Sequence, residues 1–354
     1  MVSSPMVRIK QLPEDFIVTE RPLVKPAEKT GAYLYFRLQK KERNTIDVIQ
    51  QLAKILHVPE KKIGFAGSKD KQAVTTQVCS VTGISPQRLE QVNIPDVKIT
   101  VLGYGADPIS LGDLIGNTFT ITVRDLKPAE VQQIQPVRFV PNYFDEQRFG
   151  ERNIVIGKNI ITKNFAEVVR LGVHTGQWNE LKEYRKEHPS DAVGALRLLP
   201  SRLLRMYVNA YQSYLWNETV AEYLREKGNG AKEVKYRGGF FVFVDHPEKF
   251  ASLQLPMVGF GSQEWETDTS VKQIIDHLLQ KEGITRQDFI IPQLPELSLE
   301  GGLRSVMTEV KEMVIGTIEN DELQKSKKKV TISFTLSKGS YATMVMKWMF
   351  SEPV

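Results

Sequence analysis

The sequence has almost no cysteine and no long apolar run. Its 354 residues contain a single cysteine, Cys79, so an internal disulfide framework and a cysteine-based zinc site are excluded. Cys79 lies in the alternating segment Val78–Val81 and is expected to be a buried strand residue. No segment approaches the ~20 apolar residues of a membrane-spanning helix, and Phe240–Val244 is predicted to be a short buried strand. No membrane partner is therefore expected.

Metal-ligand spacings and an export signal are also missing. The 5 histidines are scattered without H-x-x-H or H-E-x-x-H spacing, so we expect no metal. The opening segment MVSSPMVRIKQLPEDF lacks the apolar core and the small-residue cleavage site of a signal peptide. We therefore expect a cytoplasmic protein.

What is present is an ordinary globular composition with an uneven charge. Hydrophobic residues make up 41% and charged residues 25% of the chain, and the length suggests two domains or one domain with a large insertion. Residues 1–71 contain 14 Lys and Arg against 8 Asp and Glu, a net charge of +6 in a chain whose total is +5. Bases that alternate with aromatic residues in this segment favour a polyanionic partner. A solvated face is the plainer interpretation.

The segment Gly64–Gln77, GFAGSKDKQAVTTQ, stands out because it places one carboxylate, Asp70, between two lysines. A helix is predicted before it, capped by Asn44 or Thr45 and ended by Pro59, and a strand is predicted from about Thr75 to Val81. The two glycines are expected to shape a turn that presents Asp70. Reactive groups are often held on such loops between rigid elements.

Three chemistries can be considered for this segment. A phosphate-binding P-loop is excluded because Gly64 and Gly67 are too close and Lys69 is followed by Asp70. A divalent-metal site would need further carboxylates nearby, and Asp70 is the only one in the segment. What remains is a carboxylate kept ionised by nearby positive charge, available as a nucleophile or a base. A structural ion pair is the alternative.

Other motifs give this segment a context. FAGSKDKQAVTTQ occurs together with LPEDFIVTE, GNTFTITVRD at 116–125, PNYFDEQRFG at 141–150 and SKGSYATMVM near the end of the chain. In this order the motifs resemble the TruD family of pseudouridine synthases. The resemblance covers roughly residues 8–155 and 303–354, and the middle of the chain adds NAYQSYLWN.

The resemblance implies an α+β fold. Residues 1–157 and 303–354 would form a pseudouridine synthase catalytic domain with a mixed, mainly antiparallel sheet and flanking helices. Residues 158–302 would form an inserted α/β TRUD domain. This division agrees with the strand-rich ends and the helix-rich middle of the sequence.

The resemblance also implies a set of site residues. Asp70 matches the catalytic aspartate, and Lys10 matches the basic residue expected to pair with it. Further substrate contacts are implied at these positions: Phe16, Asn142, Phe144 and Tyr341. Possible RNA contacts are Lys69, Lys71 and Arg148, although Arg148 could instead fix its loop through a buried ion pair. Taken alone, each of these aromatic residues would more often belong to a core.

The implied activity is isomerisation of uridine to pseudouridine in RNA, at position 13 of tRNA, by a monomeric enzyme that requires no cofactor. Asp70 would either attack the ribose or deprotonate it, and the sequence leaves both routes open. Another RNA uridine is the alternative target. An RNA-binding or RNA-folding protein with dispensable catalysis is the alternative function. Family members often carry several bases before the GN-x-F motif, and Tyr104–Asp113 has none, so RNA backbone would have to be held elsewhere.

Overall fold

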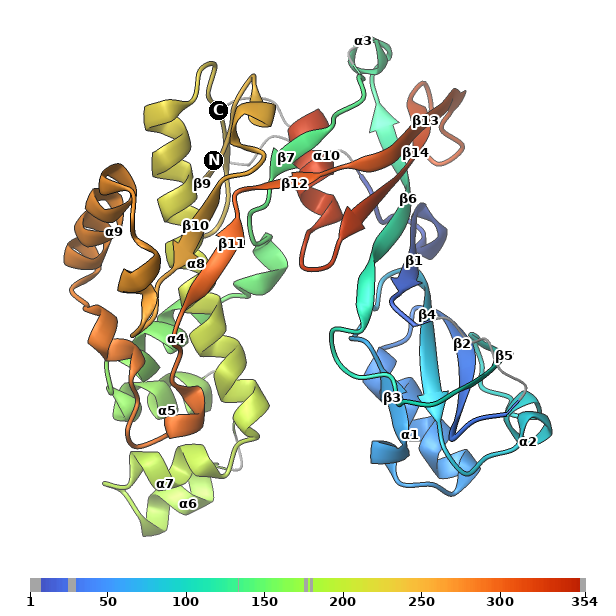
Figure 1. The fold of residues 1–354 in the computed structure, drawn as a ribbon, viewed down its shortest axis with the longest axis horizontal. Coiled ribbons are helices and arrows are strands. Elements are labelled where there is room, and N and C mark those ends of the chain that lie inside the picture. The colour runs from blue at the N-terminus through green and yellow to red at the C-terminus, as the bar shows by residue number, and fades with distance from the viewer. Residues whose placement is uncertain (1–7, 25–29, 133, 175–177, 179–180, 351–354) are drawn as a thin grey trace. The chain divides into compact units, whose positions relative to one another are not determined.

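The computed structural model describes residues 8–24, 30–132, 134–174, 178 and 181–350 (Figure 1). Its contacts divide the chain into two compact units. The described residues of unit 1 lie within Met1–Arg138 and Glu309–Ser351, and those of unit 2 lie within Phe139–Thr308. The boundaries expected from the sequence, at 157 and 303, lie inside unit 2.

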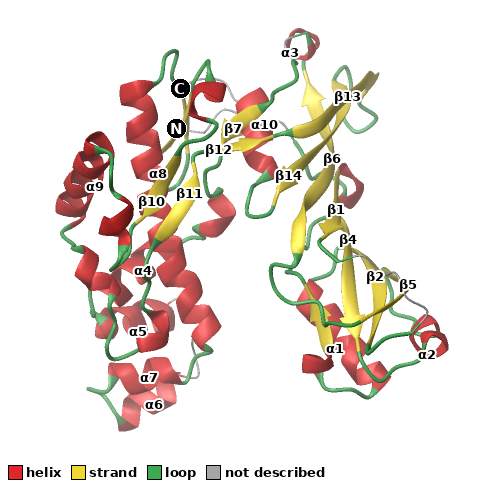
Figure 2. Ribbon diagram, viewed as in Figure 1, coloured by secondary structure: helices red, strands yellow, loops and turns green. Residues whose placement is uncertain are grey.

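Unit 1 is built on one mixed sheet of eight strands, coloured yellow in Figure 2. The strand order is β13-β14-β6-β1-β4-β2-β5, and β3 pairs with β4. Only β1 and β4 run parallel, and every other neighbouring pair in this sheet is antiparallel. The strands are β1 (Phe16–Pro22), β2 (Tyr33–Lys41), β3 (Ile63–Phe65), β4 (Val74–Val81), β5 (Val97–Gly105), β6 (Leu114–Leu126), β13 (Lys311–Asn320) and β14 (Lys328–Ser337).

Helix α1 (Thr45–Leu56) covers one face of this sheet. The Asn44 side chain accepts a hydrogen bond from the Ile46 amide and caps the helix as predicted, and the helix ends before Pro59. Its apolar stripe packs on alternate residues of β2, including Leu34, Phe36 and Leu38. The remaining helices of unit 1 are α2 (Pro86–Glu90), α3 (Pro128–Val131) and α10 (Ala342–Phe350).

Unit 2 is organised around one long helix, α8 (Ser201–Lys227), whose aromatic residues form a core. Tyr207, Tyr211 and Trp216 are buried. Helices α4 and α9 and strands β9 and β10 contact α8. The helices are α4 (Asn153–Ile161), α5 (Phe165–His174), α6 (Leu181–Glu187), α7 (Ala192–Arg197), α8 and α9 (Thr269–Glu282).

The other described strands form three two-stranded sheets. Strand β9 contains Phe241 and Val242, which are fully buried, so the short buried strand expected at Phe240–Val244 is confirmed. The pairs are β8 (Lys232–Lys235) with β9 (Phe240–Phe243), β10 (Gln254–Met257) with β11 (Gly302–Ser305), and β7 (Phe139–Pro141) with β12 (Met307–Glu309). The chain is α+β, as expected.

Candidate active site

The topology of unit 1 brings three strand ends together around Asp70. Because β1 and β4 are parallel, the start of β1 lies beside the start of β4, with Ile17 opposite Val74. Because β2 is antiparallel to β4, its last residues meet the same end, with Lys40 opposite Thr75. Asp70 lies on the loop between β3 and β4, just before that end of the sheet.

Lys10 and Asp70, which are 60 residues apart in sequence, form an ion pair at this end of the sheet. The Lys10 ammonium bonds to Oδ2 of Asp70 and lies 4.1 Å from the centre of the Phe16 ring. The second carboxylate oxygen, Oδ1, accepts a hydrogen bond from the Gln72 amide at 3.2 Å. The Asp70 side chain is 26% exposed, so a substrate can reach it. The predicted pairing of Lys10 with Asp70 is confirmed.

Buried polar side chains hold the loop that carries Asp70 through hydrogen bonds to its backbone. Thr45, at the start of α1, accepts a hydrogen bond from the Lys69 amide at 3.0 Å. Gln77, on β4, donates one to the Gly67 carbonyl at 3.2 Å. Both side chains are buried, so the loop is fixed to a helix and to a strand.

Lys40 supplies a third brace, which the sequence analysis did not predict. Its ammonium donates to the main-chain carbonyl of Asp70 at 2.8 Å and to that of Lys69 at 3.4 Å. The residue is only 1% exposed. Burial lowers the pKa of Lys40 to about 8, and the positive charge of Lys69 adds to this effect while the Asp70 carboxylate opposes it.

Lys69 and Lys71, which flank Asp70, have different surroundings. The Lys69 ammonium pairs with Glu20 on β1, and the two side chains are 7% and 1% exposed. Glu20 also accepts a hydrogen bond from the Val78 amide at 3.1 Å. Lys69 is therefore a structural partner of Glu20, whereas Lys71 is exposed. The RNA contacts expected for the two lysines stay predictions.

Gly64 has a different role from the one expected. It lies within β3, and a Cβ atom on it would meet the Ile109 carbonyl oxygen at 2.2 Å. A side chain at this position would push away the segment that carries Ile109. Gly64 is therefore required by the close approach of that segment, and it does not shape the turn at Asp70.

A buried ion-pair network holds the segment that carries Lys10. The Arg124 guanidinium, on β6, bonds to both carboxylate oxygens of Asp15 at 2.9 and 3.0 Å and to Asp321 at 3.0 Å. The Arg124 amide donates to the Arg8 carbonyl at 2.9 Å. Lys10 lies two residues after Arg8, so this network links two of the sequence motifs and fixes the backbone just before Lys10.

The predicted substrate contacts Asn142 and Phe144 lie in unit 2. Asn217, from the NAYQSYLWN segment of α8, accepts a hydrogen bond from the Phe144 amide at 3.0 Å and donates one to its carbonyl at 2.9 Å. The Arg304 guanidinium lies 4.0 Å from the centre of the Phe144 ring and 5.1 Å from that of Trp216. It also donates to Oδ1 of Asn142 at 3.0 Å. We call Asn142, Phe144, Asn217 and Arg304 the Phe144 cluster.

Arg148 and Tyr341 are the remaining predicted residues. Arg148 donates to the Ser213 hydroxyl at 3.3 Å, and its guanidinium lies 5.7 Å from the centre of the Phe144 ring. Tyr341, which precedes α10 in unit 1, is half-buried. Their roles in RNA and substrate binding stay predictions.

Comparison with known proteins assigns the chain to a family. The family model for tRNA pseudouridine synthase D (TruD) matches residues 5–186 and 178–349. The chain belongs to the TruD family. A relative named "Probable tRNA pseudouridine synthase D 2" from Methanocaldococcus jannaschii is 32% identical, over 97% of this chain and 92% of its own length. The tRNA pseudouridine synthase D of Syntrophotalea carbinolica is 30% identical, over 96% of this chain and 94% of its own length.

A solved structure supports the same assignment. A crystal structure from Methanosarcina mazei that carries the TruD name superposes on this chain with a TM-score of 0.69 and 26% sequence identity. The match covers 99% of this chain and 95% of the other. The resemblance that the motifs suggested is therefore confirmed for the family and for the fold.

The TruD motifs identified Lys10 as the partner of Asp70, but they missed Lys40 at that site and Arg304 in the Phe144 cluster. Lys40 sits in a strand whose neighbouring alternate residues are apolar, and a lysine in the pattern YLYFRLQKK is equally typical of a strand end that faces solvent. Arg304 lies 162 residues from Asn142. The sequence pattern contains nothing that pairs residues at such a separation.

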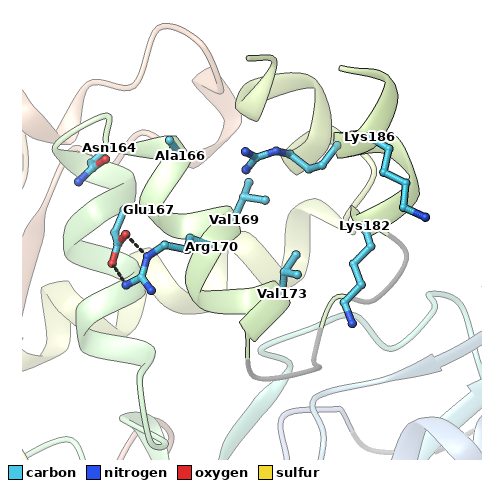
Figure 3. A pocket seen from close by; sticks show the side chains of 9 residues that line it. Asn164, Ala166, Glu167, Val169, Arg170, Val173, Lys182 and Lys186 are labelled. Atoms are coloured by element: carbon cyan, nitrogen blue, oxygen red, sulfur yellow. Dashed lines mark hydrogen bonds and ion pairs between the residues drawn. The ribbon is translucent and has the colours of Figure 1, made fainter. Parts of the chain in front are cut away.

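A separate cavity in unit 2 of this TruD protein does not resemble an active site. It has a volume of about 740 Å³ and lies between helices α5 and α6, with Val169 and Val173 on its wall (Figure 3). Among the described residues that line it, the one carboxylate is Glu167, which accepts two hydrogen bonds from Arg170 at 2.6 Å each (Figure 3). This acid is already neutralised by its partner on the same helix, and we assign the cavity no chemistry.

The described part of the chain contains no group of three or more His, Cys, Asp or Glu side chains arranged to hold a metal ion. None of its helices is both long and apolar enough to cross a bilayer. Cys79 is fully buried on β4, and burial raises the pKa of its thiol well above the usual range.

Proposed function

We propose that this TruD protein converts uridine at position 13 of tRNA to pseudouridine, with Asp70 as the catalytic carboxylate. One observation carries the proposal: Asp70 is a partly exposed carboxylate that pairs with the Lys10 ammonium on a loop braced by buried side chains. Unit 1 would be the catalytic domain and unit 2 the inserted TRUD domain. We further propose that the enzyme acts as a monomer in the cytoplasm.

The reaction explains why one carboxylate is needed. The bond between ribose C1′ and uracil N1 breaks, the base turns, and a bond forms between C1′ and uracil C5. C5 then loses its hydrogen as a proton to solvent, and N1 gains a proton. Cleavage develops positive charge on the sugar, as in glycoside hydrolysis. Asp70 can attack C1′ to give a covalent adduct, or remove the 2′ proton to give a glycal. Lys10 donates a hydrogen bond to Oδ2 of Asp70, and the Gln72 amide donates one to Oδ1. Together they fix the orientation of the carboxylate.

The uridine has to leave its base stack before Asp70 can reach the ribose. We propose that Phe16, next to Lys10, and Tyr341 contact the extruded nucleotide in unit 1. Asn142 and Phe144 are proposed as contacts from unit 2, and Lys71 and Arg148 as RNA contacts. These assignments follow from the TruD motifs, and each is testable by substitution.

The deciding experiment is tritium release from a tRNA transcript that contains uridine labelled at C5, because pseudouridine and uridine have the same mass. We expect release by the wild type and none by Asp70→Asn, with tRNA binding preserved. Asp47→Asn is the matched control, because Asp47 is an exposed residue of α1 in the same unit. It should release tritium at the wild-type rate.

Two results would contradict the proposal. If Asp70→Asn released tritium as fast as the wild type, Asp70 would have no part in the chemistry. If the wild type bound tRNA but released no tritium from any of a panel of transcripts, an RNA-binding role with dispensable catalysis would be favoured instead.

A further inference from the structure

Unit 1 contains a hollow at the end of the sheet opposite Asp70. Its volume is about 680 Å³, and its lining includes Tyr33, Phe65 and the segment Pro108–Leu111. Phe65 pairs with Cys79 and Ile63 with Val81, so β3 reaches the far end of β4. Seven steps along β4 correspond to about 23 Å. The hollow is therefore distinct from the catalytic centre.

The wall of this hollow is fixed before any partner binds. The Ile109 amide donates to the Ser80 hydroxyl at 2.9 Å, and the Gly112 amide donates to the Ala66 carbonyl at 2.9 Å. The Ile109 carbonyl fits against Gly64 only because this residue has no side chain. Hydrogen bonds and close packing thus hold the segment against β3 and β4 and keep the hollow open.

Lys61 and Lys62 give the hollow a positive charge. They belong to a short 3₁₀ turn, Glu60–Lys62, and both residues are exposed. The described residues that line the hollow include these two lysines and no carboxylate. Neither lysine has an ion pair or hydrogen bond among the described residues. Both ammonium groups can therefore pair with an anionic partner.

The remaining lining suits nucleotides better than an acidic peptide. Tyr33 and Phe65 are half-buried aromatic residues, and the Leu111 side chain is apolar in a residue that is 78% exposed. Phosphates pair with lysines, while bases and riboses pack on aromatic and apolar surfaces. An acidic peptide would use the lysines but would have no need for the aromatic faces.

We propose that this hollow binds a segment of the substrate RNA, with phosphates on Lys61 and Lys62 and a base or ribose against Tyr33 and Leu111. The inference rests on the proposed function, because it takes the substrate to be an RNA that spans from Asp70 to the hollow. The two lysines would increase the affinity for RNA and would take no part in the chemistry at Asp70.

The test compares the double variant Lys61→Ala/Lys62→Ala with the wild type for binding of an unmodified tRNA transcript at several KCl concentrations. Two lost phosphate contacts should weaken binding about tenfold or more at low salt and reduce the slope of log K against log salt by about 2. The rate of tritium release at saturating tRNA should not change. The matched control is Lys98→Ala/Lys272→Ala, which removes two exposed lysines elsewhere.

A second variant separates stacking from charge. Tyr33→Leu removes the aromatic face and keeps an apolar side chain, so binding should weaken while the salt slope stays at the wild-type value. Thermal unfolding of each variant shows whether unit 1 is still folded. Loss of affinity in a folded Tyr33→Leu variant with an unchanged slope supports the predicted packing.

The proposal is wrong if the Lys61 and Lys62 variant binds tRNA with the wild-type affinity and slope, or if the control pair produces the same change. An acidic protein partner would leave tRNA binding unaffected and so fall under the first outcome. Failure of the catalytic proposal looks different, because the wild type would then release no tritium while tRNA binding still depended on Lys61 and Lys62.

Discussion

The region around Asp70 in unit 1 and the Phe144 cluster in unit 2 are both rich in hydrogen bonds, but their chemistry differs. Around Asp70, charged groups dominate: a carboxylate, the Lys10 and Lys40 ammonium groups and the buried Glu20–Lys69 pair. In the Phe144 cluster, a neutral amide fixes the backbone of Phe144, and a guanidinium lies on its ring. The first region is built to hold ionised groups in place, and the second to hold a flat ring rigid.

This difference predicts that substitutions near Asp70 act through charge, whereas substitutions in the Phe144 cluster act through packing and hydrogen bonding. The largest effect on stability should come from Glu20→Gln, which leaves the buried Lys69 ammonium without its partner. We expect a loss of about 3 to 5 kcal/mol in the free energy of unfolding. Urea denaturation followed by circular dichroism measures it.

A matched control for Glu20→Gln is available in unit 2. Glu233 pairs with Arg225 at 2.6 Å on the surface, where both side chains are 33% exposed, so Glu233→Gln should cost less than about 1 kcal/mol. The double variant Glu20→Gln/Lys69→Met should regain most of the lost stability because neither charge of the pair remains. Equal stabilities for Glu20→Gln and Glu233→Gln would contradict the assignment of Glu20–Lys69 as a buried pair.

The next largest effect should be on kcat, in the variant Lys10→Met. Lys10→Met keeps an unbranched side chain over the Phe16 ring but removes the ammonium that holds Oδ2 of Asp70. A displaced catalytic group lowers the rate, so we expect kcat to fall about 10²-fold with little change in KM. Tritium release at saturating tRNA measures this change.

Lys41→Met is the control for Lys10→Met. Lys41 pairs with Glu14 on the surface of the same unit, where the two side chains are 43% and 54% exposed. Its loss should leave kcat unchanged. A rate for Lys10→Met within a factor of about 2 of the wild type would show that Asp70 is positioned without the ion pair.

Asn217→Ala tests the Phe144 cluster. The substitution removes both hydrogen bonds that Asn217 makes to the Phe144 backbone, and Asn217 is fully buried. Loss of buried hydrogen bonds should lower the free energy of unfolding by about 2 kcal/mol. The control is Asn209→Ala on the same helix, where the side chain is half-buried. If both variants were equally stable, the cluster would not depend on Asn217.

The smallest effect should appear in the pH dependence. The pKa of Lys40 is lowered from 10.5 to about 8 in the folded protein, so the amine loses its proton near pH 8 and no longer anchors the Asp70 carbonyl as an ammonium. We expect kcat to fall by about half at pH 8. Lys40→Arg, which stays charged, should move this decline to higher pH.

Stability should change in the opposite direction over the same pH range. Between about pH 8 and 10.5, the unfolded chain binds more protons at Lys40 than the folded protein, so this group increases stability as pH rises. A fall in kcat above pH 8 therefore cannot result from unfolding caused by Lys40. A wild-type kcat that stays constant up to pH 9 would exclude an anchoring role for the charge.

Local patterns predicted much of the structure around Asp70. The apolar spacing of residues 45–56, the Asn44 cap and Pro59 located α1, and the alternation in 74–81 located β4. These elements depend on contacts between residues close in sequence, which a local pattern records. The ion pair between Lys10 and Asp70 was predicted only through the resemblance to the TruD family, because no local rule connects residues 60 positions apart.

The sequence alone determined the family, the α+β class, the single carboxylate of the Gly64–Gln77 segment and the buried position of Cys79. Tertiary structure decided which charges meet. The antiparallel pairing of β2 with β4 brings the Lys40 ammonium to the Asp70 carbonyl. The parallel pairing of β1 with β4 brings Glu20 to Lys69. The energies of these ionised groups depend on burial and on partners from distant strands, and both are set only when the sheet has formed.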